Sequence, residues 1–572
     1  MRDDSIALSK LTHPSIKNRF PRSRRCSRDT TLGTMMTTHS LATAFSDWKN
    51  VLGSQYVLAD SAELAPYRQN VSGLDRDIPA VLLPATAGDV SAIVRIANTH
   101  VIPLHPVSGG RNWGLGSRLP VTTGTVVVDL RRMNRIRDVC IRHHYAVVEP
   151  GVTQGQLHRY LGERNLPLLL NVTGSGLDAS IIGNALERGI GYFSSRADCL
   201  SSLEIVLGAG SMLRTGSGHF PAADTPYLYR HGIGPSIDGL FAQSNYGIVT
   251  AAAVDLIPKP EAQCAMLCRV DNDSSLAALI DSLAILVKGG VIRSVVHIGN
   301  WERSEITLGP LVHRFLAKHN GAGPETTKNE IRKILATGGF GAWSAVAGLM
   351  GSSAQMRVMR GEIRRAIRGV AALRFVTDRS LAVAAGICRK LAFVPGMKRR
   401  LALLHAIQPL YGLTKGIPTD AALESVYWPV EGLPDTEVTN PDQSRSGLLY
   451  CVPFLPLDGN SVLVAVAMIR DICDSHNFAP YVTFNVVDSK ALEAVISLAF
   501  DRREGGRSSA AHACIDALTE AFIQAGFPPY RVGIQSMARI VKEDDTFWQT
   551  VKGLKAVLDP NNIISPGRYN LV

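Results

Sequence analysis

The first half of the chain alternates short apolar runs with an amphipathic helical pattern. The apolar run Pro79–Pro84 is followed by Thr86 and Asp89, whose spacing resembles a capping box at a helix start. Apolar residues then recur at positions 90, 93, 94 and 97, which lie on one helical face. Strands that alternate with helices predict an α/β or α+β domain. Further short strands are expected at Ile102–Leu104, Thr125–Asp129 and Tyr145–Glu149.

The pattern changes near residue 260, where longer apolar periods begin. It predicts a helix over Ser274–Val287 and a strand over Ser461–Met468. The tail Asp559–Gly567 contains two prolines and a glycine, which is typical of a loop. The chain is therefore divided into four parts: a leader over 1–45, a first domain over 46–259, a second domain over 260–526 and a closing segment over 527–572.

Composition excludes several classes of protein. The 572 residues are 46% hydrophobic and 19% charged, so a sizeable core is expected and wholesale disorder is not. The most apolar run, 275–292, contains Asp281 and Lys288, which argues against a membrane-spanning helix. Nine cysteines without a C-x-x-C motif are expected to be buried free thiols in a reducing compartment. We therefore expect a cytoplasmic protein without a metal site.

The net charge of +11 is concentrated in two blocks. Residues 1–45 carry eight Lys/Arg and three Asp without a sustained apolar period, so they are predicted to be a disordered basic leader. Residues 355–400 carry twelve Lys/Arg and two acidic residues but only two aromatic residues, which argues against nucleic-acid binding. Within this block, 381–400 fits either a cap helix with a solvated basic end or a segment that contacts a membrane surface or an acidic partner.

The glycine-rich run Val107–Ser117 is the most informative stretch. Its glycines at 109, 110, 114 and 116 allow positive φ angles and close approach of a ligand to the backbone. Successive amide N–H groups in such a loop suit a diphosphate. The run lacks the G-K-[ST] of a P-loop and no helix opens on it, so it is not a common dinucleotide fingerprint. Taken alone, it also fits a long turn.

Further segments follow in a definite order: Asp129–Arg135, Glu149–Thr153, Gly183–Tyr192, Ser244–Val249, Tyr530–Val532 and Asp559–Arg568. In this order and spacing the chain resembles the vanillyl-alcohol oxidase and 4-cresol dehydrogenase family of FAD-linked oxidoreductases. The resemblance implies a two-domain α+β fold. An FAD-binding domain would be followed by a cap domain over the substrate, and the closing segment would return to the FAD domain and the active site.

The resemblance also implies which residues hold FAD. The diphosphate would lie on Ser108–Ser117, and the covalent or non-covalent state of the flavin stays open. Arg111 stands where some relatives carry the histidine that forms a covalent bond to the flavin. Tyr427 directly precedes Trp428, which resembles the Tyr close before a Trp in relatives whose flavin is bonded to a tyrosine. The expected cofactor-binding residues are Ser108, Gly109, Gly110, Arg111, Asn112, Gly116, Ser117, Pro150, Gly151, Gly183, Asn184, Gly189, Ile248 and Tyr427.

Family members that act on para-alkylphenols hold the phenolate between two tyrosines and an arginine, and hydride leaves the benzylic carbon for flavin N5. The resemblance implies catalytic roles for Tyr530, Arg531, Arg568 and Asp178. The second tyrosine position is occupied by Leu115, which cannot hydrogen-bond a phenol. From the resemblance as a whole we predict an oxidoreductase that acts on a hydroxylated aromatic, either a para-substituted phenol or a compound resembling a benzylic alcohol.

Two other functions stay open on the sequence. Arg531 and Arg568 suit a carboxylate as well as a phenolate, so the substrate could be a 2-hydroxy acid or an aliphatic alcohol. The departures from the family pattern also fit a flavin-binding subunit without turnover. The expected partners are a small aromatic substrate, oxygen or a cytochrome c-type electron acceptor, and a second copy of the chain in a homo-oligomer.

Overall fold

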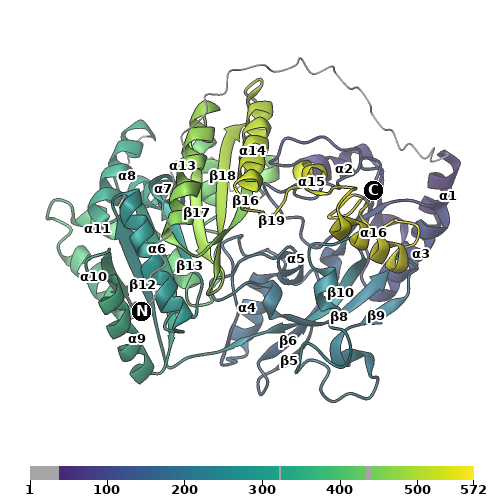
Figure 1. Ribbon diagram of the computed structural model, residues 1–572, viewed down its shortest axis with the longest axis horizontal. Helices are drawn as coiled ribbons and strands as arrows, with labels where there is room; N and C mark the ends of the chain where they lie inside the picture. The colour runs from purple at the N-terminus through teal and green to yellow at the C-terminus, as the bar shows by residue number, and fades with distance from the viewer. Residues whose placement is uncertain (1–37, 321–323, 433–439, 572) are drawn as a thin grey trace, which may run out of the picture.

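The computed structural model is α+β, as the sequence predicts, and its sheets form two groups (Figure 1). It describes residues 38–320, 324–432 and 440–571. The sheets of the first domain use strands up to Pro258, and the cap sheet begins at Ala262. Among the described residues no helix combines the length and apolarity needed to cross a membrane.

The first domain contains a mainly parallel sheet and an antiparallel sheet. The order of the first sheet is β1 (Val57–Leu58), β2 (Val81–Leu82), β4 (Val126–Asp129) and β3 (Leu104–Val107). The order of the second is β5 (Ile136–Cys140), β6 (Tyr145–Val148), β10 (Gly247–Asp255), β8 (Leu200–Leu207) and β9 (Met212–Arg214). A small pair joins β7 (Leu168–Leu169) to β11 (Ile257–Pro258).

Helix α3 (Ala87–His100) of the first domain starts at the predicted polar cap. Thr86 Oγ1 accepts a hydrogen bond from Asp89 N, and the Asp89 side chain accepts one from Thr86 N, so the predicted capping box is present. The helices are α1 (Thr38–Leu52), α2 (Ser61–Arg68), α3 (Ala87–His100), α4 (Gln154–Glu163) and α5 (Ile181–Leu186), with α15 (Met537–Ile540) and α16 (Thr546–Leu558) from the closing segment.

The cap domain is built on one antiparallel sheet of eight strands. Its order is β15 (Ala372–Val376), β12 (Ala262–Val270), β14 (Trp343–Gly351), β13 (Val296–Asn300), β17 (Tyr481–Val486), β18 (Ala491–Asp501), β16 (Ser446–Pro456) and β19 (Pro529–Arg531). Its helices are α6 (Asp273–Lys288), α7 (Trp301–Asn320), α8 (Pro324–Gly338), α9 (Ser353–Ile367), α10 (Asp378–Lys390), α11 (Met397–Leu413), α12 (Glu424–Glu431), α13 (Gly459–Ser475) and α14 (Arg507–Gln524).

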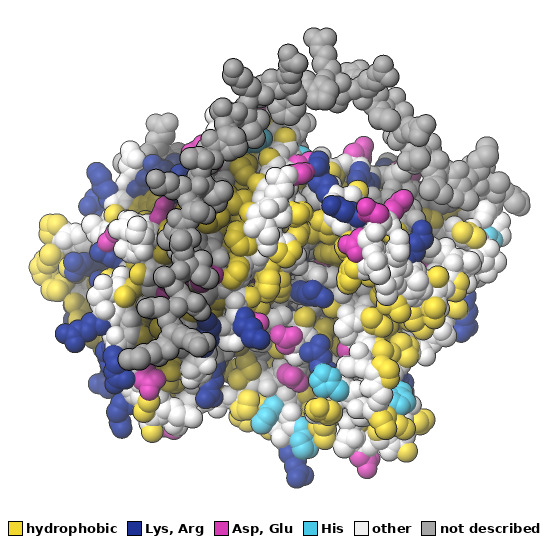
Figure 2. Space-filling view, viewed as in Figure 1, with side chains coloured by type: hydrophobic (Ala, Val, Ile, Leu, Met, Phe, Trp, Pro, Cys, Tyr) yellow, Lys and Arg dark blue, Asp and Glu magenta, His cyan; other side chains and the backbone are white. Residues whose placement is uncertain are grey.

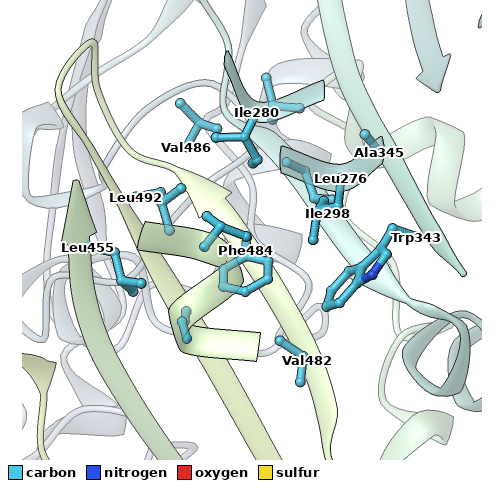
Figure 3. Packing of buried hydrophobic residues seen from close by; sticks show 14 of the residues in the cluster. Leu276, Ile280, Ile298, Trp343, Ala345, Leu455, Val482, Phe484, Val486 and Leu492 are labelled. Carbon is cyan, nitrogen blue, oxygen red and sulfur yellow. The ribbon is translucent and has the colours of Figure 1, made fainter. Parts of the chain in front are cut away.

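One face of the cap sheet packs in a hydrophobic core, and the other face lines a cavity. Because side chains alternate along a strand, Val482, Phe484 and Val486 of β17 point toward α6 and α13 and join the largest hydrophobic core of the described chain. Figure 3 shows Phe484 at the centre of this core, close to Ile298 and Leu276. The intervening residues of β17 face the opposite side, where a large cavity lies.

Two expectations from the sequence are wrong. Residues 38–45 of the predicted disordered leader belong to α1, because Ala44 and Trp48 are fully buried against α3. The first 37 residues of the leader lie outside the described residues. The predicted strand Ser461–Met468 is part of helix α13, whose buried residues recur with a helical period and whose N-cap Asp458 accepts a hydrogen bond from Ser461 N.

We predict that α1 stabilises the first domain through Trp48, whose indole Nε1 donates to Ile93 O at 3.3 Å. Trp48→Ala should lower the free energy of unfolding by about 3–5 kcal/mol, the usual cost of removing a large buried aromatic side chain. Urea unfolding measures this loss when it is followed by far-ultraviolet circular dichroism, which does not rely on tryptophan fluorescence. Val51→Ala on the same helix is the control, because Val51 is 44% exposed. An equal loss in both variants would contradict the packing role of α1.

Candidate functional site

Two cavities meet between the first domain and the cap domain. The glycine-loop cavity, of about 170 Å³, is lined by the run 105–119 and by parts of α5, β10 and the closing segment. The cap cavity, of about 440 Å³, is lined mainly by the inner face of the cap sheet and by α7, α11 and α12. Six residues line both cavities and so mark their junction: Arg111, Asn112, Leu115, Ser175, Asn184 and Arg531.

The glycine-loop cavity owes its shape to backbone conformations that side chains disfavour. Gly110 has φ +65°, and a Cβ there would lie 2.2 Å from Arg118 Cγ. Ser117 also has a positive φ and donates its hydroxyl to Asp442 at 2.7 Å, which ties the end of the loop to the cap domain. The loop is therefore a formed cradle with its backbone close to the space it encloses.

All but three of the predicted cofactor-binding residues line this cavity: Ser108, Gly109, Gly110, Arg111, Asn112, Gly116, Ser117, Pro150, Gly183, Asn184 and Ile248. Gly189 lines the cap cavity instead. Gly151 lines neither cavity, and a Cβ there would lie 2.6 Å from Arg131 O and 2.7 Å from Met133 O. Tyr427 is buried in α12 and also lines neither cavity.

Unsatisfied polar atoms at the junction fit a flavin ring. Asn184 Oδ1 and Arg531 Nε are buried there without a hydrogen-bond partner among the described residues. Buried polar groups of this kind normally have partners, and a flavin ring has both an N–H donor and carbonyl acceptors. The junction thus offers one acceptor and one donor to a ring that would extend from the glycine loop.

The closing segment completes the wall of the glycine-loop cavity. Arg568 is partly buried there and forms an ion pair with Glu187. His105 Nδ1 lies 3.0 Å from Ser565 Oγ, and burial, reinforced by the charge of Arg568, lowers the His105 pKa to about 3. His105 is therefore neutral at ordinary pH, and the charged groups of this wall balance each other.

The cap cavity contains a row of hydrogen-bonded polar residues on three neighbouring strands. His297 of β13 is the cross-strand partner of Asn485 in β17, and Asn485 is the partner of Glu493 in β18. Asn485 Nδ2 donates to Glu493 Oε1 at 2.8 Å, and Asn485 Oδ1 lies 2.6 Å from His297 Nδ1. A carbonyl oxygen only accepts, so His297 Nδ1 carries the proton and Nε2 is an acceptor.

Burial controls the ionisation of this row. Burial raises the pKa of Glu493 to about 7, although the hydrogen bond from Asn485 and the charge of Arg531 lower it. Burial lowers the pKa of His297 to about 4. Its Nε2 atom is buried and has no hydrogen-bond partner among the described residues. Near neutral pH, Glu493 can therefore gain or lose a proton while His297 stays neutral.

Two arginines place positive charge in the cap cavity. Arg531, at the end of β19, donates from Nη2 to Asn112 Oδ1 at 3.0 Å. The Arg303 guanidinium forms no hydrogen bond or ion pair with any residue that the structure describes. Burial raises the pKa values of Tyr192 and Tyr450, and the charge of Arg303 opposes both increases, so this cation lies near these two rings.

Only one of the four predicted catalytic residues, Arg531, lines the cap cavity. The Tyr530 hydroxyl is directed away and donates to Arg188 O at 3.0 Å, while its ring stacks on Phe454. Asp178 is 64% exposed and pairs with Arg111 at 2.6 Å. Arg568 faces the glycine-loop cavity, as described above. Tyr530, Asp178 and Arg568 thus do not line the cap cavity, and their catalytic roles stay predictions.

Sequence reasoning missed the polar residues of the cap cavity, namely His297, Arg303, Asn485 and Glu493. They lie far apart in the sequence and belong to no recognisable motif. One signal was available for three of them: His297, Asn485 and Glu493 each interrupt an otherwise mainly apolar stretch that the sheet pattern would place in a strand. Leu115, noted as a departure from the family pattern, does line both cavities.

Comparison with known proteins relates the chain to flavoenzymes. A family model described as "FAD binding domain" matches residues 78–216. The 1'-carboxy-chondrochloren decarboxylase of Chondromyces crocatus is 34% identical over 94% of this chain and 98% of that protein. The 4-cresol dehydrogenase (hydroxylating) flavoprotein subunit of Pseudomonas putida is 28% identical over 92% of this chain and 95% of that protein.

A solved structure extends the similarity to the whole fold. The 4-ethylphenol oxidase from Gulosibacter chungangensis has a TM-score of 0.79 and 26% identity, covering 93% of this chain and 98% of that chain. The matched FAD-binding region contains the glycine loop, and the full-length similarity includes the cap domain. These findings confirm the predicted FAD cofactor and the predicted two-domain fold.

We predict that FAD binding depends on the backbone of the glycine loop. Gly110→Val should reduce FAD retention at least about tenfold, because a branched side chain is strained at positive φ and would displace the loop. Flavin absorbance relative to protein absorbance after purification measures the effect. Gly162→Val is the control, because a Cβ at this exposed helical glycine meets no atom within 4 Å. Equal flavin content in both variants would remove the loop from the FAD site.

Proposed function

Because this chain belongs to the vanillyl-alcohol oxidase and 4-cresol dehydrogenase family of FAD-linked oxidoreductases, we propose that it oxidises a hydroxylated aromatic substrate. The substrate would be a para-substituted phenol or a related benzylic alcohol. One observation carries the proposal: Arg531 and the buried Glu493 line the same cavity, and Arg531 also borders the FAD site. The names of two relatives specify a cresol and an ethylphenol, which supports this substrate class.

The cap cavity suits an aromatic ring with one hydroxyl group. Trp113, Tyr192 and Tyr450 contribute aromatic walls, and Leu115 supplies an apolar contact at the junction. With the substrate hydroxyl directed toward Arg531, the guanidinium would stabilise the oxyanion that forms on deprotonation. Electrostatic stabilisation by one such preorganised group is typically worth about 10²–10³ in rate.

Glu493 is the group best suited to take the hydroxyl proton. It is 3% exposed, lines the cap cavity and has a pKa near the pH at which general bases work best. The tyrosine expected at position 115 is a leucine, and Tyr530 is hydrogen-bonded elsewhere. Bound FAD supplies the acceptor for the hydride that leaves the carbon attached to the ring.

His297 would position the reacting molecule. Its neutral Nε2 can accept a hydrogen bond from a second substrate hydroxyl or from water. The Tyr192 ring lies 4.4 Å from the imidazole, centroid to centroid, and Asn485 holds Nδ1, so the ring orientation is fixed from two sides. Water held in this way would be ready to add to an oxidised, electron-poor benzylic carbon.

A second candidate function is oxidation of an aromatic substrate that also carries a carboxylate. The observation that favours it is Arg303, a cation in the cap cavity without a partner among the described residues. Arg303 is only partly buried, and a substrate carboxylate that reached it in the cavity would form a charge-assisted contact. The relative at 34% identity is named as a decarboxylase of a carboxy compound, which supports the same substrate chemistry.

The electron acceptor remains a prediction: oxygen or a cytochrome c-type partner. One relative is named as a flavoprotein subunit, so that protein works with another subunit. Cytoplasmic location, homo-oligomer formation and covalent attachment of FAD also remain open predictions.

We predict that anaerobic reduction of the flavin by 4-ethylphenol accelerates as pH rises through about 7, because only ionised Glu493 can accept the substrate proton. The rate should increase about tenfold per pH unit below this value and level off above it. Glu493→Gln should abolish the inflection in the plot of flavin-reduction rate against pH. It should also lower this rate about 10²–10⁴-fold with FAD retained. The exposed Glu163→Gln is the control. An unchanged inflection in Glu493→Gln would exclude Glu493 as the base. Failure of all phenols to reduce the wild-type flavin would refute the proposed function.

Arg303 should discriminate between substrates with and without a carboxylate. For 4-hydroxyphenylpropanoate, Arg303→Met should raise KM about 10–100-fold, the usual loss for a charge-assisted contact. For 4-ethylphenol, KM should change less than about threefold. Arg303→Lys should restore part of the difference, because it keeps the charge. Equal losses for both substrates would assign Arg303 a structural role, and reduction by lactate but not by phenols would favour a 2-hydroxy acid oxidoreductase.

A further inference from the structure

The helices α10 and α11 form a strongly basic surface element, which we call the basic hairpin (residues 378–413). It contains no acidic residue between 379 and 413. Its cations are Arg379, Arg389, Lys390, Lys398, Arg399 and Arg400. Arg399 pairs with Glu330 at 3.0 Å, and none of the others forms an ion pair with a described residue. The hairpin thus carries several cations that the described chain does not neutralise.

The same hairpin exposes large apolar side chains. Val383, Ile387 and Leu391 follow one another at four-residue spacing on one face of α10 and its end, and they are 54%, 51% and 38% exposed. Phe393, in the connection to α11, is 82% exposed. Figure 2 shows hydrophobic and basic side chains side by side at the left edge of the molecule, where Figure 1 places α9, α10 and α11.

The inner side of the hairpin belongs to the cap cavity. Ile407, Leu410 and Tyr411 of α11 line its wall, together with Val376 just before α10. No residue of the hairpin lines the glycine-loop cavity. The exposed apolar surface therefore lies behind the apolar end of the cap cavity, on the side of the cap away from the FAD-binding domain (Figure 1).

We propose that the basic hairpin binds the surface of a membrane that contains anionic lipid. Val383, Ile387 and Phe393 would enter the interfacial layer, and the surrounding Lys and Arg side chains would contact lipid phosphates. Apolar residues ringed by cations are the combination that such a surface recognises. The inference goes beyond the proposed function, and it places the apolar wall of the cap cavity next to a phase in which apolar aromatic compounds accumulate.

An acidic electron-transfer protein fits the hairpin less well. Such a partner must approach the flavin, whereas the hairpin contributes to the cap cavity and not to the FAD site. Charge attraction alone would also not explain why four large apolar side chains are exposed to solvent. The observations therefore favour a lipid surface. The experiment below would also detect a purely electrostatic contact, such as one with an acidic protein.

The test is co-sedimentation of the full-length holoenzyme with vesicles. One set contains equal parts of phosphatidylglycerol and phosphatidylcholine, and the other contains phosphatidylcholine alone. Wild type should sediment with the anionic vesicles at low salt, remain mostly in solution with the neutral ones, and bind the anionic ones more weakly at about 0.5 M salt. FAD content and melting temperature of every variant confirm that it is folded.

Two variants remove the two kinds of contact. The charge variant, K390S/K398S/R400S, should weaken partitioning roughly 100-fold, since each cation near an anionic surface contributes about fivefold. The apolar variant, V383S/I387S/F393S, should weaken it at least about tenfold. Each has a control elsewhere on the surface with the same kind of change: R142S/K259S/K288S for charge and F220S/Y229S/I233S for exposed apolar side chains.

The outcomes separate the possibilities. Loss of binding in both hairpin variants, with both control variants sedimenting as wild type does, supports the proposal. If wild type does not sediment with anionic vesicles at low salt, the proposal is wrong. If the apolar variant binds as wild type does, the contact is electrostatic only and suits an acidic partner, which also overturns the proposal. Equal losses in the hairpin and control variants would show non-specific attraction and likewise exclude a dedicated surface.

Discussion

The two-residue period of the cap sheet is the constraint on which the rest of the structure depends. On β18, Leu492 and Ala494 belong to the hydrophobic core, whereas Glu493 and Val495 line the cap cavity. A shift of one residue in strand register would bury Glu493 among the helices and place leucines in the cavity. The same register aligns His297, Asn485 and Glu493 across three strands. One packing requirement therefore fixes both the core and the order of the polar row.

The closing segment joins this sheet to the FAD site. Arg531 is the last residue of β19, which pairs with β16 at the edge of the cap sheet. Further along, Asp559 is fully buried, pairs with Lys555 at 2.6 Å and accepts a hydrogen bond from Ile564 N at 2.7 Å. Ser565 N then donates to Leu104 O at 2.7 Å, just before the glycine loop. The segment thus anchors both cavities, which explains why its sequence pattern resembles that of flavoenzymes.

The sequence predicts the parts of the site that depend on local backbone conformation. Gly110 and its neighbours need little tertiary information, because positive φ angles and close approach are properties of glycine itself. The polar row is different, since His297 and Asn485 are 188 residues apart in sequence. The helix over Ser461–Met468 was missed because its short apolar run fits either period until its partners are known. Tyr530 has the residue type of its family position, but its hydroxyl orientation depends on Arg188, which no local pattern reveals.

Charge balance explains why the buried carboxyl and the arginines belong together. Asp178 neutralises Arg111, and Glu493 lies near Arg531, whose charge lowers the Glu493 pKa against the effect of burial. In the proposed reaction, transfer of a proton from a substrate hydroxyl to Glu493 would move the negative charge to the substrate oxygen beside Arg531. The cavity therefore holds the same net charge before and after this step, so no additional charge has to be buried. A tyrosine at position 115 would stabilise the same oxyanion by a hydrogen bond alone, whereas in the proposed reaction Glu493 and Arg531 would do so by exchanging one anion for another.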